Sequence, residues 1–303
     1  MTQTTQSKRL PKFKRAPKQA PPIRLTDRDR ELMLSVYHYR FLPTSLIVRR
    51  HFGSLTRGRA RLRGLYHHKY VDRHYLPTQG PTTSEAIYSL GPAAVPELAA
   101  FYGFDPADVK RRRRRVEPMF LAHQLAIARF RIGVAYAGAP NGIGFADWLD
   151  ETEGRMRFQG EDERGGLRTL TLAPDGMSWL RSKRARFAFA LEVDRGSMPL
   201  GRIEHKFRRY QQADAAGALR PLLGAERFRI LVLAPSERRA QGIVTAAERA
   251  QAANVWVATD AALEADPALE PLWQRPGSGE RLPLFRQSQV FDPKDKPTTQ
   301  GGS

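Results

Sequence analysis

The sequence predicts two domains of different fold class, a small helical domain with a β-hairpin followed by a larger α/β domain. A chain of 303 residues is long enough for about two domains, and 41% hydrophobic residues are enough for two cores. Helical spacing of apolar residues dominates the first third of the chain, whereas strand-like and helical segments alternate after residue 116. Charge divides the chain in the same way. Of the formal net charge of +19, residues 1–115 carry +16 and residues 116–303 carry +3.

The composition narrows the class of protein further. The chain has no cysteine, which excludes disulfides, thiolate zinc sites and cysteine nucleophiles and is typical of a reducing compartment. It has no uncharged apolar run approaching the roughly 18–20 residues that a membrane span needs, and no apolar segment follows the basic N-terminus as in a signal peptide. We therefore expect a cytoplasmic protein without a membrane partner.

The domain boundaries are predicted from shifts in composition. Both ends of the chain are polar and contain proline, so they lack the apolar surface that would offset the entropy of ordering. We expect a disordered basic arm over residues 1–24, a helical domain over 25–109, a basic linker over 110–116, an α/β domain over 117–286 and a disordered tail over 287–303.

Capping and breaking signals order the elements of the first domain. Thr26 and Asp29 form a capping-box pattern at the start of a helix, and residues 41–45 end that helix and begin a second. A third helix is expected over 55–69, followed by two short strands around a turn-rich loop and a closing helix over 92–102. Three helices followed by a hairpin is the order of a winged helix-turn-helix domain.

The third helix carries four arginines away from its apolar stripe, as two adjacent ridges with a spacing of four residues. The corresponding helix of a helix-turn-helix domain enters the major groove, where arginine suits phosphate and guanine contacts. The basic run KRRRRR at 110–115 would add salt-sensitive affinity for phosphates. A solvated arginine-rich face in a protein-binding domain and RNA binding are the alternatives. The predicted contacts to double-stranded DNA are Arg57, Arg59, Arg61, Arg63, Arg111, Arg112 and Arg113.

The second domain is predicted as a mixed-sheet α/β sandwich, because helical and strand-like segments alternate along it. Helices are expected over 118–137, 199–214 and 237–252, and strands over 143–149, 167–173, 187–193, 228–233 and 255–258, with a possible further strand at 177–180.

The carboxylates of Asp175 and Glu192 form a candidate metal site in this domain. The strand period of two places Glu192 and Asp194 on one face, and Asp175 lies in a Pro-Asp-Gly turn before that strand. If the strands pair, Asp175 and Glu192 converge on one Mg²⁺, which could activate water for phosphodiester cleavage. In the alternative interpretation the turn is an ordinary one, and Glu192 and Asp194 form ion pairs with Arg195 or Arg202.

Residues 25 to about 233 contain a series of motifs: LTDRDRELMLSVYHYRFLPTSLI, RARLRGLYHHKYVDR, YSLGPAA, His123, LAPDG, FALEVDRGS and the K-x-x-x-Y of HKFRRY. Together these motifs resemble those of the replication-relaxation family of plasmid and mobile-element proteins. The resemblance implies an N-terminal winged helix, DNA binding and a role in plasmid replication and DNA relaxation. The second domain also resembles the restriction-endonuclease-like nucleases with the signature PD…(D/E)xK, in which Asp175 and Glu192 would be the two carboxylates.

One position departs from the nuclease signature, because Asp194 occupies the place of its lysine. Lys206 on the following helix, with Tyr210 one turn later, offers a substitute, and His123 is a lower-ranked neighbour. The leading hypothesis is a DNA-binding protein of replication, relaxation or mobilisation, with other plasmid proteins as partners. It would be a candidate Mg²⁺-dependent nickase with catalytic residues Asp175, Glu192, Asp194 and Lys206. A non-enzymatic regulator or adaptor with a degenerate nuclease domain stays open, as does a tyrosine relaxase as a weaker third class.

Overall fold

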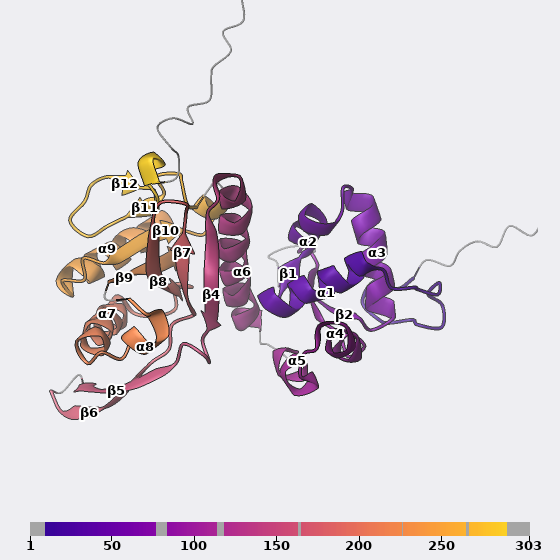
Figure 1. Cartoon of the computed structure of the whole chain (residues 1–303), viewed down its shortest axis with the longest axis horizontal. Helices are drawn as coiled ribbons and strands as arrows, with labels where there is room; N and C mark the ends of the chain where they lie inside the picture. The colour runs from indigo at the N-terminus through magenta and orange to yellow at the C-terminus, as the bar shows by residue number, and fades with distance from the viewer. Residues whose placement is uncertain are drawn as a thin grey trace, which may run out of the picture. The chain divides into compact units, whose positions relative to one another are not determined.

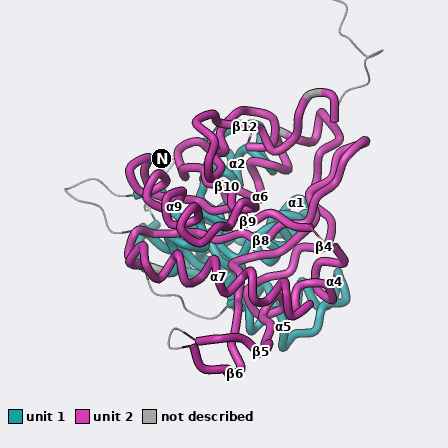
Figure 2. Tube along the Cα trace, turned by 90° about the vertical axis from the view of Figure 1, so that its left-hand side faces the viewer, with its two compact units in different colours: residues 1–128 teal, residues 129–303 magenta. Residues whose placement is uncertain are grey.

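The computed structural model describes residues 10–76, 84–113, 118–162, 165–225, 227–264 and 267–289. Internal contacts divide the chain into unit 1, residues 1–128, and unit 2, residues 129–303 (Figure 2). The sequence placed the domain boundary at residues 116 and 117, whereas this division falls inside helix α6 (Pro118–Gly138). The reason is packing: Leu121 and Leu125 of α6 join a buried cluster with Phe41 and Ile87 of unit 1.

Unit 1 contains the predicted helices and hairpin in the predicted order. Thr26 and Asp29 form the expected capping box, with the amide of Thr26 donating to Asp29 Oδ2 at 2.7 Å. The strands form an antiparallel sheet in the order β1-β3-β2, in which Val71 pairs with Leu90. The elements are α1 (Asp27–Tyr39), β1 (Leu42–Pro43), α2 (Thr44–His51), α3 (Leu55–His67), β2 (Val71–His74), β3 (Ile87–Leu90), α4 (Ala94–Tyr102) and α5 (Pro106–Arg112).

Residues 10–24 differ from the predicted disordered arm. Composition alone indicated no order here, but polar contacts rather than a core hold this segment against α3 and β2. Arg15 donates to the carbonyl oxygen of Tyr66 at 2.9 Å, the amide of Ala16 donates to His67 Nδ1 at 3.0 Å, and Ala20 is buried. Residues 1–9 of the predicted arm lie outside the described residues.

Unit 2 is built on a mixed seven-stranded sheet in the order β12-β11-β10-β9-β8-β7-β4 (Figure 1). Strands β8, β9 and β10 run parallel, and the other pairs are antiparallel. Helices α7 and α9 share a core with one face of the sheet, and Phe130 of α6 packs on Phe189 of the opposite face. The elements after α6 are η1 (Ala139–Asn141), β4 (Gly144–Asp150), β5 (Met156–Glu161), β6 (Leu167–Leu172), β7 (Gly176–Arg181), β8 (Arg186–Val193), α7 (Leu200–Ala215), α8 (Arg220–Leu223), β9 (Phe228–Ala234), α9 (Glu237–Arg249), β10 (Val255–Thr259), η2 (Ala261–Glu264), β11 (Trp273–Gln274), β12 (Arg281–Leu282) and η3 (Gln287–Gln289).

Two features of unit 2 differ from the sequence prediction. Strand β6 does not join the main sheet but pairs with β5, which the sequence analysis missed, as a separate hairpin packed on α7. Gly176 is the first residue of β7 rather than part of a free turn, and a Cβ there would lie 2.1 Å from the ring of Trp148. This glycine is therefore required by close packing of the indole.

Residues 287–289 of the predicted disordered tail form η3, and Ser182 Oγ donates to the carbonyl oxygen of Gln289 at 2.6 Å. The remainder of that tail, from residue 290, lies outside the described residues. Among the described helices, none combines the length and the apolar character needed to cross a membrane.

Candidate functional site

Pairing of β7 with β8 brings Asp175 and Glu192 together. Gly176 pairs with Leu191, so the residue before Gly176 lies beside the residue after Leu191. The amide of Asp175 donates to the carbonyl oxygen of Leu191 at 2.9 Å, and the amide of Val193 donates to Asp175 Oδ2 at 2.7 Å. The second of these bonds orients the Asp175 carboxylate toward β8.

Glu192 is buried, with 6% of the residue exposed, and both of its carboxylate oxygens have donors from α7. Tyr210 Oη donates to Glu192 Oε1 at 2.5 Å, and the ammonium of Lys206 forms an ion pair with Glu192 Oε2. The spacing of four residues places Lys206 and Tyr210 on the same side of α7, and Tyr210 belongs with Phe207 to the buried core. Glu192 therefore pairs with Lys206 and not with Arg195 or Arg202.

The electrostatics of this cluster follow from burial. Burial raises the pKa of Glu192 to about 7; the charge of Asp175 adds to the rise, and the ammonium of Lys206 opposes it. Burial also opposes the charged form of Lys206, but the charges of Glu192 and Asp175 outweigh it and raise the pKa of the ammonium. Burial and then the charge of Glu192 raise the pKa of Tyr210 well above its usual value.

Asp194 does not join the cluster. Strand β8 ends at Val193, so the alternation that placed Asp194 beside Glu192 no longer applies. The Asp194 carboxylate accepts hydrogen bonds from Arg239 Nε at 2.6 Å and Arg239 Nη2 at 3.1 Å, and Gly196 donates to it at 3.1 Å. These contacts tie the end of β8 to α9, and they assign Asp194 a structural contact instead of the catalytic one that the sequence predicted.

Two neighbours of Glu192 and Lys206 were not predicted as part of the site: the carboxylate of Glu151, and Tyr210 as a hydrogen-bond donor to Glu192. Glu151 follows β4, whose last residue Asp150 pairs with Gly176, and the charge of Glu151 raises the pKa of Lys206. The acidic end of the strand was visible in the sequence, but its neighbour on α7 was not. In the described part of the chain, no group of three or more histidine, aspartate or glutamate side chains is arranged to hold a metal ion.

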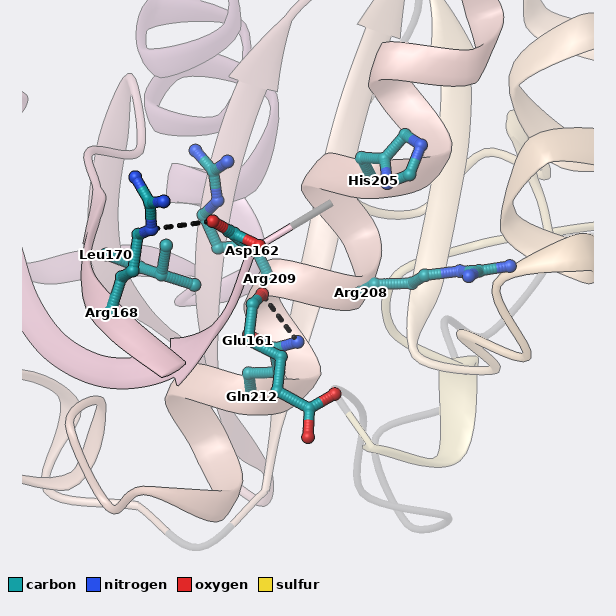
Figure 3. A pocket seen from close by; sticks show the side chains of 8 residues that line it. All are labelled: Glu161, Asp162, Arg168, Leu170, His205, Arg208, Arg209 and Gln212. Atoms are coloured by element: carbon teal, nitrogen blue, oxygen red, sulfur yellow. Dashed lines mark hydrogen bonds and ion pairs between the residues drawn. The ribbon is translucent and has the colours of Figure 1, made fainter. Parts of the chain in front are cut away.

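A hollow of about 420 Å³ lies between the β5–β6 hairpin and α7, on the helix that carries Lys206 and Tyr210 (Figure 3). Arg168 at its hairpin wall forms an ion pair with Asp162 at 2.8 Å, and Gln212 Nε2 donates to the carbonyl oxygen of Glu161 at 3.3 Å. The walls of the hollow are therefore mostly polar, and Glu192, Lys206 and Tyr210 are not among the residues that line it. Its lining residues are Glu161, Asp162, Arg168, Leu170, His205, Arg208, Arg209 and Gln212.

The arginines of α3 divide into two groups. Arg57, Arg59 and Arg63 are exposed, and no ion pair within the described residues involves them. Arg61 instead donates to Asp29 Oδ1 at 2.8 Å and to the carbonyl oxygen of Arg24 at 2.7 Å. Arg61 thus supports the start of α1 and differs from the outward-facing contact that was predicted.

The basic run after α4 is also only partly exposed. Lys110, Arg111 and Arg112 belong to α5, and residues 114–117 lie outside the described residues. The side chain of Arg111 is 66% exposed. Arg112 stacks on Tyr37 with its guanidinium 4.9 Å from the ring centre, and Arg113 Nε donates to the carbonyl oxygen of Leu90 at 3.2 Å. Within this predicted linker, Arg112 and Arg113 are therefore anchored to unit 1.

Fold and site define a two-unit protein whose α/β unit holds a buried carboxylate–lysine–tyrosine cluster. The model of the family described as Replication-relaxation matches residues 33–222, more than half of the chain. The chain belongs to the replication-relaxation family, as the sequence motifs indicated.

Among solved structures, that of the restriction endonuclease FokI matches with 11% sequence identity and a TM-score of 0.29. The match covers 78% of this chain and 43% of the FokI chain, less than half of the latter's length. No curated protein matches the chain.

Proposed function

We propose that the protein binds duplex DNA and acts in the replication or relaxation of a plasmid or other mobile element, with unit 2 hydrolysing phosphodiester bonds in the presence of Mg²⁺. The observation that carries the enzymatic part is the ion pair of Lys206 with Glu192 beside Asp175. Sequence reasoning took Asp175 and Glu192 from the nuclease signature, proposed Lys206 as a substitute for the signature's lysine, and named Asp194 as a fourth catalytic residue.

The donor set fits a hard divalent cation that keeps several water ligands. Mg²⁺ binds through one or two carboxylates plus water, and Asp175 and Glu192 supply two. Burial raises the pKa of Glu192 to about 7, and the charge of Asp175 adds to the rise, so a cation bound between the two carboxylates would stabilise their charged forms. Asp175 and Glu192 would hold the ion, which would activate water and neutralise phosphate charge.

The remaining residues have distinct roles in this proposal. Hydrolysis forms a bond from a water oxygen to phosphorus and breaks the bond to one ester oxygen, which takes up a proton as it leaves. Lys206 stabilises the negative charge on the phosphoryl oxygens. Tyr210 is fully buried and donates to Glu192, so it positions that carboxylate and does not attack DNA. This burial also removes Tyr210 as the nucleophile of a tyrosine relaxase.

Unit 1 would dock the protein on DNA as a winged helix. The support is the element order α1, α2, α3, β2 and β3, together with the exposed Arg57, Arg59 and Arg63 on α3. In a helix-turn-helix domain this helix lies in the major groove, and arginines there contact phosphates and guanine. Arg111 would add a further phosphate contact.

Nicking of supercoiled plasmid DNA tests the enzymatic proposal. We expect Mg²⁺-dependent conversion to open circles by the wild type, and a loss of roughly 100-fold or more in Asp175→Asn and Glu192→Gln, the scale of removing one essential electrostatic group. Asp214→Asn on the exposed end of α7 is the matched control and should nick like the wild type. Nicking that survives both substitutions would contradict the site.

Binding of Mg²⁺ measured by calorimetry, without DNA, gives a second readout. The wild type and Asp214→Asn should release or take up heat on titration with Mg²⁺, and Asp175→Asn should bind it at least tenfold more weakly. Equal binding by Asp175→Asn and the wild type would show that Asp175 is not a ligand.

A non-enzymatic adaptor is the second candidate, and one observation favours it. Both carboxylate oxygens of Glu192 already accept from Lys206 and Tyr210, so the cluster is satisfied without a metal ion. In that case unit 2 would contribute protein or DNA contacts only. Absence of nicking together with absence of Mg²⁺ binding, while the wild type still binds DNA, would select the adaptor.

A further inference from the structure

A second hollow, of about 520 Å³, lies in unit 1 between α3, the β2–β3 sheet and the N-terminal segment. Its walls carry four cationic side chains, Lys12, Arg59, Arg63 and Arg73. Its acidic side chain, Glu85, already accepts hydrogen bonds from the amide and hydroxyl of Ser45, with Ser45 Oγ 3.0 Å from Glu85 Oε2. The hollow is therefore strongly basic.

The N-terminal wall of this hollow is held by a small set of contacts that we call the arm clip, formed by Arg15, His67 and Asp72. Arg15 donates to the carbonyl oxygens of Tyr66 at 2.9 Å and Val71 at 3.1 Å, and it forms an ion pair with Asp72. The amide of Ala16 donates to His67 Nδ1 at 3.0 Å. The clip fixes the backbone three residues after Lys12.

Lys12 is then directed by its neighbours on β2 and just after it. Arg73 Nη1 donates to the carbonyl oxygen of Lys12 at 3.0 Å. The ammonium of Lys12 lies 5.3 Å from the ring centre of Tyr75 and 5.2 Å from that of Phe13. The rings of Phe13 and Tyr75 restrict the position of the Lys12 ammonium but carry no charge. The positive charge of Lys12 therefore stays available to a ligand.

We propose that this arm-lined hollow binds the phosphodiester backbone of duplex DNA, and that the arm clip positions Lys12 for this contact. The inference rests on the proposed DNA binding by unit 1 but not on the nuclease activity of unit 2. Two cations of the hollow come from α3, the helix proposed to face the major groove. Backbone phosphates flank that groove, so Lys12 and Arg73 extend the same contact across the edge of the groove.

Fluorescence anisotropy with a labelled 24-base-pair duplex and the full chain tests the role of Lys12. Each phosphate contact contributes about 0.9 to the slope of log K against log salt. We expect Lys12→Ala to reduce the slope between 50 and 200 mM NaCl by about 1 and to weaken binding about 3- to 10-fold. Lys18→Ala removes the same charge from the same segment outside the hollow and should change affinity less than twofold. Equal effects of the two variants would overturn the assignment.

The substitution Asp72→Asn distinguishes an effect of the arm clip on DNA binding from an effect of the net charge of the protein. This substitution raises the net charge by one, so simple attraction to DNA predicts tighter binding. The clip predicts the opposite, binding at least threefold weaker, together with faster hydrogen exchange at the amide of Ala16. A thermal melt checks that unit 1 remains folded. Equal or tighter binding with an exchanging Ala16 amide would show that the clip does not serve DNA binding.

Arg59→Ala/Arg63→Ala separates failure of this inference from failure of the proposed function. If this double variant binds the duplex like the wild type, unit 1 does not read DNA through α3 and both proposals fail. If it binds at least tenfold more weakly while Lys12→Ala and Asp72→Asn bind normally, only the present inference fails. Tighter binding of a single-stranded RNA of equal length than of the duplex would overturn the choice of ligand.

Discussion

In unit 1 the side chains of Arg57, Arg59 and Arg63 reach solvent, whereas in unit 2 Glu192 is buried and a single lysine compensates its charge. The first arrangement produces a long-range field that salt weakens, which suits docking on a polyanion. The second produces a group whose protonation is set by its few neighbours, which suits chemistry at one bond. In the proposed function, unit 1 would therefore supply the affinity for DNA and unit 2 the reactivity.

The comparison also predicts where substitutions will be costly. Exposed ion pairs typically contribute about 0–1 kcal/mol to stability, whereas breaking a buried pair costs about 3–5 kcal/mol. Substitutions of the exposed Arg57, Arg59 and Arg63 on α3 should therefore change DNA binding with little effect on folding. Substitutions in the Glu192 cluster should change both.

The largest expected effect on stability is that of Lys206→Met. Removing the ammonium leaves Glu192 buried with only Tyr210 as donor, so we expect the free energy of unfolding to fall by about 3–5 kcal/mol in urea denaturation at pH 8. The double variant Lys206→Met/Glu192→Gln should recover at least half of that loss, because no charge is left buried. A double variant less stable than Lys206→Met would show that the cluster is not held together by this pair.

The pH dependence of stability follows from the raised pKa of Glu192. Between its usual value of 4.5 and about 7 the folded protein retains a proton that the unfolded chain has released, so stability falls as pH rises through this window. The loss should reach about 3 kcal/mol, because each pKa unit corresponds to about 1.4 kcal/mol. Denaturation of wild type and Glu192→Gln at pH 5, 6, 7 and 8 measures it. If the free energy of unfolding changed with pH equally in the wild type and in Glu192→Gln, the raised pKa of Glu192 would be contradicted.

Arg61→Ala should destabilise unit 1 by about 1–3 kcal/mol without changing the salt slope of DNA binding, because Arg61 bonds the buried Asp29. The pKa of Asp29 is lowered, against the effect of its burial, by hydrogen bonds from Arg61 and Thr26. This carboxylate stabilises the fold above its unfolded pKa, and the contribution is lost as pH falls through the folded value. Arg57→Ala is the control, which should keep the melting temperature and lower the salt slope by about 1.

The smallest effect is expected in α5. Arg111→Ala should leave stability within about 0.5 kcal/mol of the wild type, since its side chain is mostly exposed, and should weaken DNA binding about twofold. Arg113→Ala should show the reverse, a lower melting temperature with nearly unchanged DNA binding, because Arg113 donates to Leu90. Equal losses of DNA affinity in both would mean that the whole run contacts phosphates.

Much of the fold was predictable because its signals are local. The capping box at Thr26, the apolar spacing of α7 and the strand run of β8 each lie within a few residues, and each element formed near its expected bounds. Strand β5 escaped prediction because only Met156 and Phe158 alternate with polar residues, too short a pattern without its partner β6. The boundary between the units falls after Ala128 and not at residues 116 and 117, because α6 contributes residues to the core of each unit.

Sequence reasoning selected several residues of the candidate site but not all of their partners. Asp175, Glu192 and Lys206 were selected from their spacing and the nuclease signature, and the structure brings Lys206 and Tyr210 onto Glu192. Asp194 was placed on the same face because the period of two was extended one residue past the strand. The contribution of Glu151 depends on β4 lying next to β7, which no local pattern reveals.

By itself the sequence determined the order of the main helices and strands, the concentration of positive charge before residue 116 and the short list of carboxylates in the second domain. These properties depend on residue type and spacing alone. Only the tertiary structure decided which charged groups meet: Arg61 with Asp29, Arg239 with Asp194 and Lys206 with Glu192. A charge selects its partner by distance and burial after folding, and residues far apart in the chain become neighbours only when the sheet and its helices pack.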